Sequence, residues 1–341
     1  MSLARAIETG DLAELPSRRD EAWHWTDLRG LIRELPAKAG PGHAWGPGAF
    51  SQAGARASLE IVNGRGPASH SLMDGAVLEL RFIADGAAAS TSALTLAVTG
   101  HAVLLESYES AAASLASVDL DITLAEGASL ERIVICDDAA DAVLVTQAEV
   151  RLAPGAHFAQ TVLTNGARRQ RLETRVLQPG QGAVSRLDGV YLNAGQRHSD
   201  ITTVVTHAGV GGTTDQLIKG VVRDQARGVF QGRIVVEPGA DKTDARMGHH
   251  ALVLSDRAEV DAKPELLIEA DDVACAHGNT VGALDEDALF YAMQRGIPED
   301  AAKAMLTEAF VAEVVDRIEH EGAREVARAW VTERLGADHA V

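Results

Sequence analysis

The stretch LAEGA (124–128) decides the fold, because the same phrase returns three more times along the chain, as LAPGA (152–156), LQPGQ (177–181) and VEPGA (236–240). The glycines of these phrases are Gly127, Gly155, Gly180 and Gly239. The first two intervals between them are nearly equal, and the third is close to twice as long. A recurring turn of this period is typical of a solenoid, whose coils bury their apolar faces by stacking, and glycine permits a corner with positive φ.

The region around these turns has the texture of strands. Between about residues 58 and 283, short alternating runs such as AVLELRFI (76–83) and ITTVVTH (201–207) are separated by turns. Coils of roughly 25 to 30 residues would give roughly eight coils, within the range of known solenoids. A β-sandwich would also show many short strands, but it gives no reason for one turn phrase to return at this interval. We therefore predict a mainly β chain built as a parallel β-helix.

The two ends of the chain have a helical pattern. Near the N-terminus, SRRDEAWHWTDLRGLIREL (17–35) places Trp23, Leu28, Leu31 and Ile32 at the spacing of one helix face, and Pro36 ends that pattern. A connector rich in Gly and Pro follows. We predict an N-terminal helical segment over residues 1–44, a β-helix over 45–283 and a C-terminal helical domain over 284–341.

Within the C-terminal part, the helical period begins after VGALDED (281–287). Leu289, Phe290 and Met293 share one face of a first helix, which Gly296 ends. Pro298 then begins a second helix, with two acidic residues in its first turn, where the helix dipole favours them. A last helix is predicted from about residue 323 to 335. We expect the apolar stripe of these helices to pack on the solenoid or on a partner.

Composition narrows the classes of partner. The chain carries 31 Lys and Arg against 49 Asp and Glu, a net charge of −18, which repels nucleic acid and anionic membranes. The first fifteen residues lack an apolar run long enough for a signal peptide, and no later stretch reaches the roughly 20 apolar residues of a membrane helix. We expect a cytoplasmic protein in which the two cysteines, Cys136 and Cys275, are free thiols.

Several enzyme motifs are absent from the sequence. There is no GxxxxGK[ST] loop, and GVGG (209–212), which lacks the lysine, is interpreted as a turn. GxSxG, HExxH and CxxC are also absent, so we do not expect a self-sufficient enzyme. The alternative is a β-solenoid enzyme that uses its many carboxylates on a polysaccharide or an acidic substrate. Aromatic residues are only 4%, too few for sugar platforms, so most of these carboxylates are predicted to form a solvated face.

The motif ADDVACAHG (270–278) places Cys275 two residues before His277. In the preceding KPELLIEADD (263–272), alternation places Leu266 and Ile268 toward the core. Continued without a break, this alternation directs Cys275 and His277 outward. A bulge near Asp271 and Asp272 would reverse every later side chain.

Two interpretations of Cys275 and His277 remain open from the residues alone. In one, they are a half-buried thiol and an unrelated histidine. In the other, they offer a thiolate and an imidazole to iron or zinc. Two such ligands do not complete a site, because an iron-sulfur cluster is usually held by four, so the others would have to come from a second chain.

The remaining cysteine and the adjacent histidines are given no metal role. Cys136, in the apolar run IVIC (133–136), is expected to be a small buried hydrophobe. His249 and His250 are neighbours, so on a strand they point to opposite faces and cannot share a metal.

Two stretches of the chain resemble a known family. The longer is DARMGHHALVLSDRAEVDAKPELLIEADDVACAHGNTVGALDEDALFYAMQRGIPEDAAKAMLTEAFVAEVVDRI (244–318), which is similar to the C-terminal half of the SufB/SufD proteins of the SUF iron-sulfur cluster assembly machinery, and within them to the SufD branch. The shorter is PSRRDEAWHWTDL (16–28). Together they cover roughly a quarter to a third of the chain.

The resemblance implies a right-handed parallel β-helix flanked by helical parts, and a non-catalytic scaffold subunit. It implies pairing with SufB through the β-helix edge and with the SufC ATPase through the C-terminal helices. It also implies a transient iron-sulfur cluster at the SufB interface, with no cofactor bound stably by the isolated chain. Whether the isolated chain forms a homodimer stays open.

The resemblance also assigns roles to individual residues. His277 matches the histidine that faces SufB, and Cys275 matches the motif cysteine, so both are candidate ligands of iron or of the cluster. The positions that match the SufC dock are Arg295, Gly296, Ile297, Pro298, Glu308, Ala309 and Phe310, for which a helix turn and its core are the competing interpretation. GHHAL (248–252) and Glu269 depart from the family pattern, which leaves the detailed contacts around His249, His250 and Glu269 open.

Overall fold

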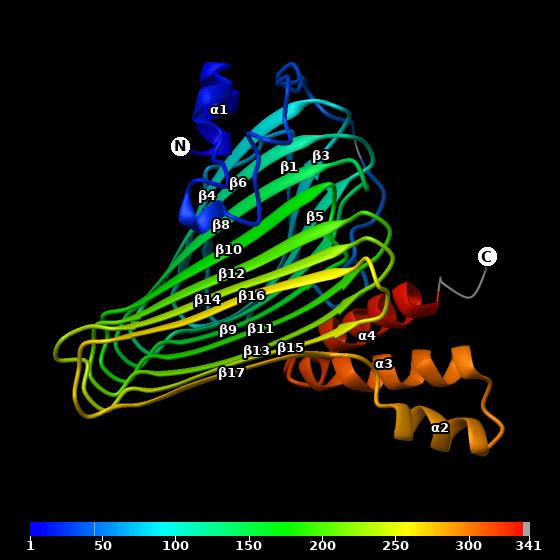
Figure 1. Ribbon diagram of the computed structural model, residues 1–341. Helices are drawn as coiled ribbons and strands as arrows, with labels where there is room; N and C mark the ends of the chain where they lie inside the picture. Colours follow the sequence, from blue (N-terminus) through cyan, green and yellow to red (C-terminus); the bar gives the residue numbers. More distant parts are fainter. Residues whose placement is uncertain (44, 337–341) are drawn as a thin grey trace.

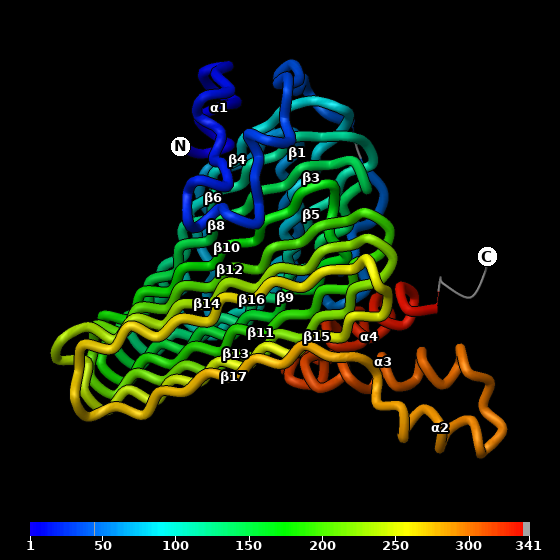
Figure 2. The backbone as a smooth tube through the Cα atoms, in the orientation of Figure 1, coloured from blue at the N-terminus to red at the C-terminus, as the bar shows by residue number. Residues whose placement is uncertain are grey.

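The strands of the chain form two parallel sheets, which the backbone visits in turn (Figures 1 and 2). The structure is a computed structural model that describes residues 1–43 and 45–336. Odd-numbered strands make the nine-stranded sheet β1-β3-β5-β7-β9-β11-β13-β15-β17, and even-numbered strands make the eight-stranded sheet β2-β4-β6-β8-β10-β12-β14-β16. Each coil gives one strand to each sheet, so the predicted parallel β-solenoid of about eight coils is confirmed.

The strands are mostly 9 or 10 residues long. The odd-numbered strands are β1 (Ala57–Val62), β3 (Ala76–Ala84), β5 (His101–Ser110), β7 (Ser129–Asp137), β9 (His157–Thr164), β11 (Val184–Asn193), β13 (Thr213–Val222), β15 (Asp244–Val253) and β17 (Ala274–Gly282). The even-numbered strands are β2 (Ser69–Leu72), β4 (Ala89–Val98), β6 (Leu115–Leu124), β8 (Val143–Leu152), β10 (Arg169–Gln178), β12 (His198–His207), β14 (Arg227–Val236) and β16 (Glu259–Ile268).

The coils lengthen along the chain. Ala57 pairs with Leu78 of the next coil, and the interval from His101 to its partner Ser129 is already longer. Near the C-terminal end of the solenoid, Arg227 of β14 pairs with Glu259 of β16, which is a longer interval still. The body is accordingly broader at the β14 to β17 end in Figure 1.

The glycines of the repeated phrase serve two purposes. Gly127, Gly155 and Gly239 have φ angles of 66°, 62° and 85°, so they hold the left-handed corners that were predicted. Gly180 does not have a positive φ. A Cβ on Gly180 would lie 2.3 Å from the backbone carbon of Ala153, so glycine is needed there for the close approach of two coils.

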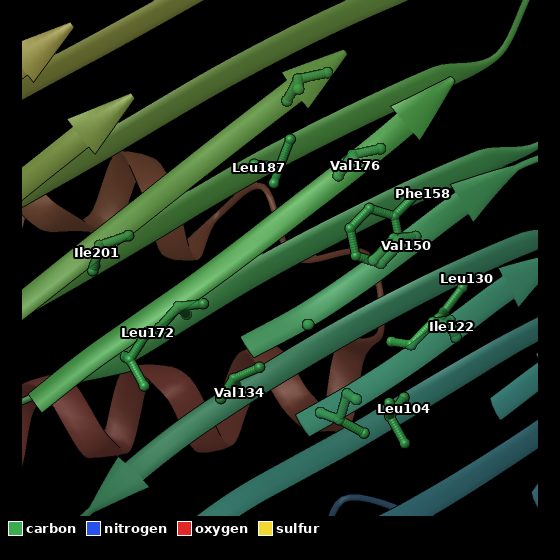
Figure 3. Packing of buried hydrophobic residues seen from close by; sticks show 14 of the residues in the cluster. Leu104, Ile122, Leu130, Val134, Val150, Phe158, Leu172, Val176, Leu187 and Ile201 are labelled. Atoms are coloured by element: carbon green, nitrogen blue, oxygen red, sulfur yellow. The ribbon is translucent and has the colours of Figure 1, made fainter. Parts of the chain in front are cut away.

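The space between the sheets is filled by inward side chains from both, as Figure 3 shows for Phe158 and Leu187 of one sheet and Val150 and Val176 of the other. Not every carboxylate lies on a solvated face. Glu106 is buried in the interior and accepts two hydrogen bonds from Arg132, at 2.6 and 2.8 Å. The ion pair is tolerated there because each charge has its partner.

The N-terminal segment differs from the prediction. It forms α1 (Leu3–Thr9) and two short 3-10 turns, η1 (Leu12–Glu14) and η2 (Glu21–Trp23), rather than a helix over residues 17–35. The reason is tertiary: Arg171 of β10 donates a hydrogen bond to the carbonyl of Ala22 and stacks 4.6 Å from the Trp23 ring. These contacts fix the segment on the even-numbered sheet as turns.

The three C-terminal helices were predicted correctly: α2 (Glu286–Gln294), α3 (Glu299–Val315) and α4 (Glu321–Gly336). Apolar side chains of α3 and α4, including Val311 and Trp330, pack on the outer face of the odd-numbered sheet, whereas α2 stands away from the solenoid (Figure 1). No helix in the described part of the chain is long and apolar enough to span a membrane. The division into three domains stays a prediction.

Candidate functional site

The candidate site lies at the last strand of the solenoid. β17 ends the odd-numbered sheet and β16 ends the even-numbered one, so both lie at the same open end. The backbone N–H of Ala274 donates a hydrogen bond to the carbonyl oxygen of Thr243, on the β15 side. Because alternate residues of a parallel strand bond to opposite neighbours, the next amides of β17 on the outer side belong to Cys275, His277, Asn279 and Val281. Such an edge is a template for another strand.

The side chains of Cys275 and His277 point toward the interior of the solenoid, not outward as predicted. They pair in register with Ala245 and Met247 of β15, which are both buried in the core. The alternation does not continue unbroken, because β16 ends at Ile268 and a turn over residues 269–273 precedes β17. The two side chains do share one face of the strand, as predicted.

The same open end exposes apolar side chains. Leu266 and Ile268 face the core as predicted, beside Ile234 and Val236 of β14. Ile268 is nevertheless 44% exposed and Val281 is 48% exposed. Apolar residues in register with a core but left uncovered are typical of a surface that another protein covers.

Cys275 and His277 differ in readiness to bind a metal. Cys275 packs partly against the core, and this burial raises the pKa of its thiol. The thiolate is the metal-binding form, so at neutral pH Cys275 is held mainly in the non-binding form. His277 is exposed, so its imidazole is open to an approaching ligand or chain. Two side chains remain fewer than the four ligands that a cluster usually takes.

His249 and His250 lie on opposite faces of β15, as predicted. His249 is fully buried in the interior, and His250 is half-buried on the outer face. His249 hydrogen-bonds to Tyr191 of β11 and to Asn279 of β17, at 2.9 and 2.7 Å. Asn279 was missed by the sequence argument, although its position two residues after His277 places it on the same face.

Cys136 is fully buried, and burial raises the pKa of its thiol well above the usual range. It therefore acts as a small hydrophobe, as predicted, and both cysteines are free.

The residues predicted to dock an ATPase fall into two groups. Arg295, Gly296, Ile297 and Pro298 form the turn between α2 and α3, where the Arg295 guanidinium stacks 4.6 Å from the Tyr291 ring. This turn is mostly exposed.

The second group lies in α3. Glu308 and Ala309 are exposed, and Glu308 accepts a hydrogen bond from Thr332 of α4. Phe310 instead packs toward the odd-numbered sheet, where Lys219 lies 4.5 Å from its ring centroid. The structure therefore gives Phe310 a packing role, and the docking role of both groups stays a prediction.

Comparisons with known proteins point to one family. The model of the family described as SUF system FeS cluster assembly, SufBD core domain, matches residues 83–310. The iron-sulfur cluster assembly protein SufD of Escherichia coli (strain K12) is 35% identical over 178 residues, which are 52% of this chain and 42% of that protein. SufD of Bacillus subtilis (strain 168) is 35% identical over 146 residues, 43% of this chain and 33% of that protein.

A SufBD family protein of Synechocystis sp. (strain ATCC 27184 / PCC 6803 / Kazusa) is 30% identical over 198 residues, 58% of this chain and 44% of that protein. The matched region therefore spans less than half of each of these three relatives.

Proposed function

The chain belongs to the SUF-system SufBD core-domain family, and on that premise we propose that it is a non-catalytic scaffold subunit of iron-sulfur cluster assembly, in the role of SufD. One observation carries the proposal: β17, the last strand of the described solenoid, presents Cys275 and His277 on one face beside edge amides that point away from β15. The chain supplies some of the ligands of the cluster, together with a surface on which a partner that supplies the other ligands can bind. The cluster is cargo of this surface.

The first partner is a SufB subunit that adds its own strand to β17. A strand placed there continues the odd-numbered sheet and covers Val281, which is half exposed in the isolated chain. It also brings its own ligands next to His277, and Cys275 is the second candidate ligand from this chain. A second copy of this chain offers the same edge, so a homodimer of the isolated chain competes with the SufB pair.

The second partner is a SufC ATPase on the C-terminal helices. Phe290 and Tyr291 of α2 are 62% and 60% exposed, beside the exposed turn from Arg295 to Pro298. Large apolar side chains clustered on a projecting helix support a docking role. The exposed Glu308 and Ala309 of α3 extend this surface, while Phe310 supports it from the sheet side.

Co-expression with a SufB and a SufC tests this proposal. We expect the three chains to elute together in size-exclusion chromatography, with this chain contacting both others. The double substitution Phe290→Ser/Tyr291→Ser should release SufC and leave SufB bound. Arg328→Gln, on the exposed face of α4, is the matched helix control and should release neither. Elution of this chain alone, at concentrations where the controls form complexes, would contradict the proposal.

A further inference from the structure

A hydrogen-bonded chain runs from the interior of the solenoid to its open edge. Its members are Tyr191 on β11, His249 on β15 and Asn279 on β17. The Asn279 Oδ1 atom can only accept, so the His249 Nδ1–H donates to it, at 2.7 Å. Nε2 of this tautomer is then an acceptor, and the Tyr191 hydroxyl donates to it at 2.9 Å.

The interior of the solenoid has room for these three hydrogen-bonded residues. The His249 ring is nearly parallel to the rings of Phe230 and Tyr191, with centroids 4.9 and 6.0 Å away. A Cβ on Gly220 would lie 1.8 Å from the Tyr191 ring, and one on Gly228 would lie 2.3 Å from it. Both glycines are therefore needed to make room for the tyrosine. His249 is fully buried, so its orientation is fixed by packing as well as by hydrogen bonds.

The hydrogen bond to His249 occupies the oxygen of the Asn279 amide. Its NH₂ group has no hydrogen-bond partner among the described residues, and Asn279 is exposed, so this group is open to take a ligand as its partner. Asn279 follows His277 by two residues on the same face of an extended strand, and such residues are roughly 7 Å apart. A group bound to the His277 imidazole therefore comes within reach of the Asn279 amide.

We propose that Asn279 is a further residue of the edge site, where its Nδ2–H donates a hydrogen bond to an anionic sulfur atom of the cluster held at His277, and that His249 is the positioning residue behind it. This inference rests on the proposed function. Hydrogen bonds to the sulfur atoms of a cluster disperse their negative charge and raise the reduction potential. The donor belongs to this chain, so it would act whichever ligands the partner brings.

The same strands offer a matched control. On the outer face, the His250 Nδ1 atom hydrogen-bonds to Thr280 Oγ1 at 2.7 Å. This second histidine pair joins the same two strands and lies one residue along each of them, but it faces away from the interior. Substitutions there disturb the strand edge equally without touching the proposed donor.

The test uses the assembled complex loaded with a cluster. Asn279→Asp keeps an oxygen for the His249 N–H and removes the amide donors. We expect a lower reduction potential of the bound cluster, shifted Fe–S bands in resonance Raman spectra, and roughly tenfold faster cluster loss, the size of one charge-assisted hydrogen bond. His249→Leu should shift the potential in the same direction. His249→Gln, which retains an N–H donor, should restore it.

Thr280→Val and His250→Leu should leave the potential, the Raman bands and the rate of cluster loss unchanged. An Asn279→Asp complex with the potential and retention of the unsubstituted complex would overturn the inference. So would equal effects from the outer pair, because that would mean a general disturbance of the edge. His277→Ala separates this inference from the proposed function: a cluster fully retained without His277 defeats the site itself.

Discussion

Met247 and His277 are neighbours across β15 and β17, yet the first is buried and the second is exposed. The two side chains point the same way, and only the coil that covers Met247 distinguishes them. His277 therefore occupies a core-facing position that has no cover at the end of the described solenoid. Such a position buries its apolar and backbone groups only when another strand is added to the sheet. We therefore expect this edge to control partner binding.

Val281→Pro tests the edge directly. The Val281 N–H lies on the outer side of β17, so proline removes a donor to an added strand without breaking the ladder to β15. We expect SufB binding to weaken by at least about tenfold, the value of one lost hydrogen bond plus the clash of the ring. Surface plasmon resonance on the isolated chains measures this. Val281→Ala, which keeps the N–H, is the control, and equal affinities of the two variants would contradict edge pairing.

The C-terminal helices should depend on a buried ion pair. The Arg317 Nε atom lies 3.1 Å from Oδ2 of Asp188, a fully buried β11 carboxylate, and burial raises the pKa of Asp188 to about 7 despite this contact. Arg317→Gln leaves the charge of Asp188 without its nearest partner, so at pH 8 we expect a loss of about 2 kcal/mol in the free energy of unfolding.

Urea denaturation measures this loss, and Asp188→Asn/Arg317→Gln should recover most of it. The control is Arg328→Gln, because the Arg328–Asp316 pair is more than half exposed on both sides and should be worth less than about 0.5 kcal/mol. Equal losses for Arg317 and Arg328 would show that the buried carboxylate does not hold the helices in place.

Stability should fall in mild acid because of His249. Burial lowers the pKa of His249 to about 4, below the value of about 6.5 in an unfolded chain. The unfolded state therefore binds a proton that the folded state does not, so the stabilisation is complete above pH 6.5 and is lost as the pH falls toward 4. His198 and His207, with pKa values of about 4, act in the same direction. Asp188 and Asp138, whose pKa values burial raises to about 7 and about 6, act in the opposite direction, but they are outnumbered by the three histidines.

Urea midpoints at pH 7, 6 and 5 should show this decline, and His249→Gln should make it shallower. Nitrogen-15 NMR of the isolated chain should also find the proton of His249 on Nδ1. A His249 ring that titrates near 6.5, or that carries its proton on Nε2, would disagree with the buried hydrogen-bonded chain.

The solenoid and the three C-terminal helices were predictable from the sequence because local chemistry determines them. A left-handed corner favours glycine, as at Gly127 and Gly155, whatever the surroundings, and the period of the apolar residues after Asp285 is helical. The N-terminal segment was not predictable in this way, because contacts of Trp23 with Arg171, which lies far along the sequence in β10, override its helical pattern.

The candidate site was predictable in its residues but not in its geometry. Cys275 and His277 were identified, yet the face they occupy depends on the turn at residues 269–273, which lacks glycine and proline. The contact between His249 and Asn279 could not be predicted from the sequence for another reason. It depends on the register between coils, and the coil length changes along the chain.

The most direct test of the scaffold role is the iron and sulfide content of the complex that carries His277→Ala. We predict that the content falls to background while the subunit ratio and the elution volume stay unchanged, because His277 is exposed and its loss costs little stability. His250→Ala, which removes a histidine from the opposite face of the neighbouring strand, should retain the full content. A His277→Ala complex with the iron, sulfide and visible absorption of the unsubstituted complex would contradict the account.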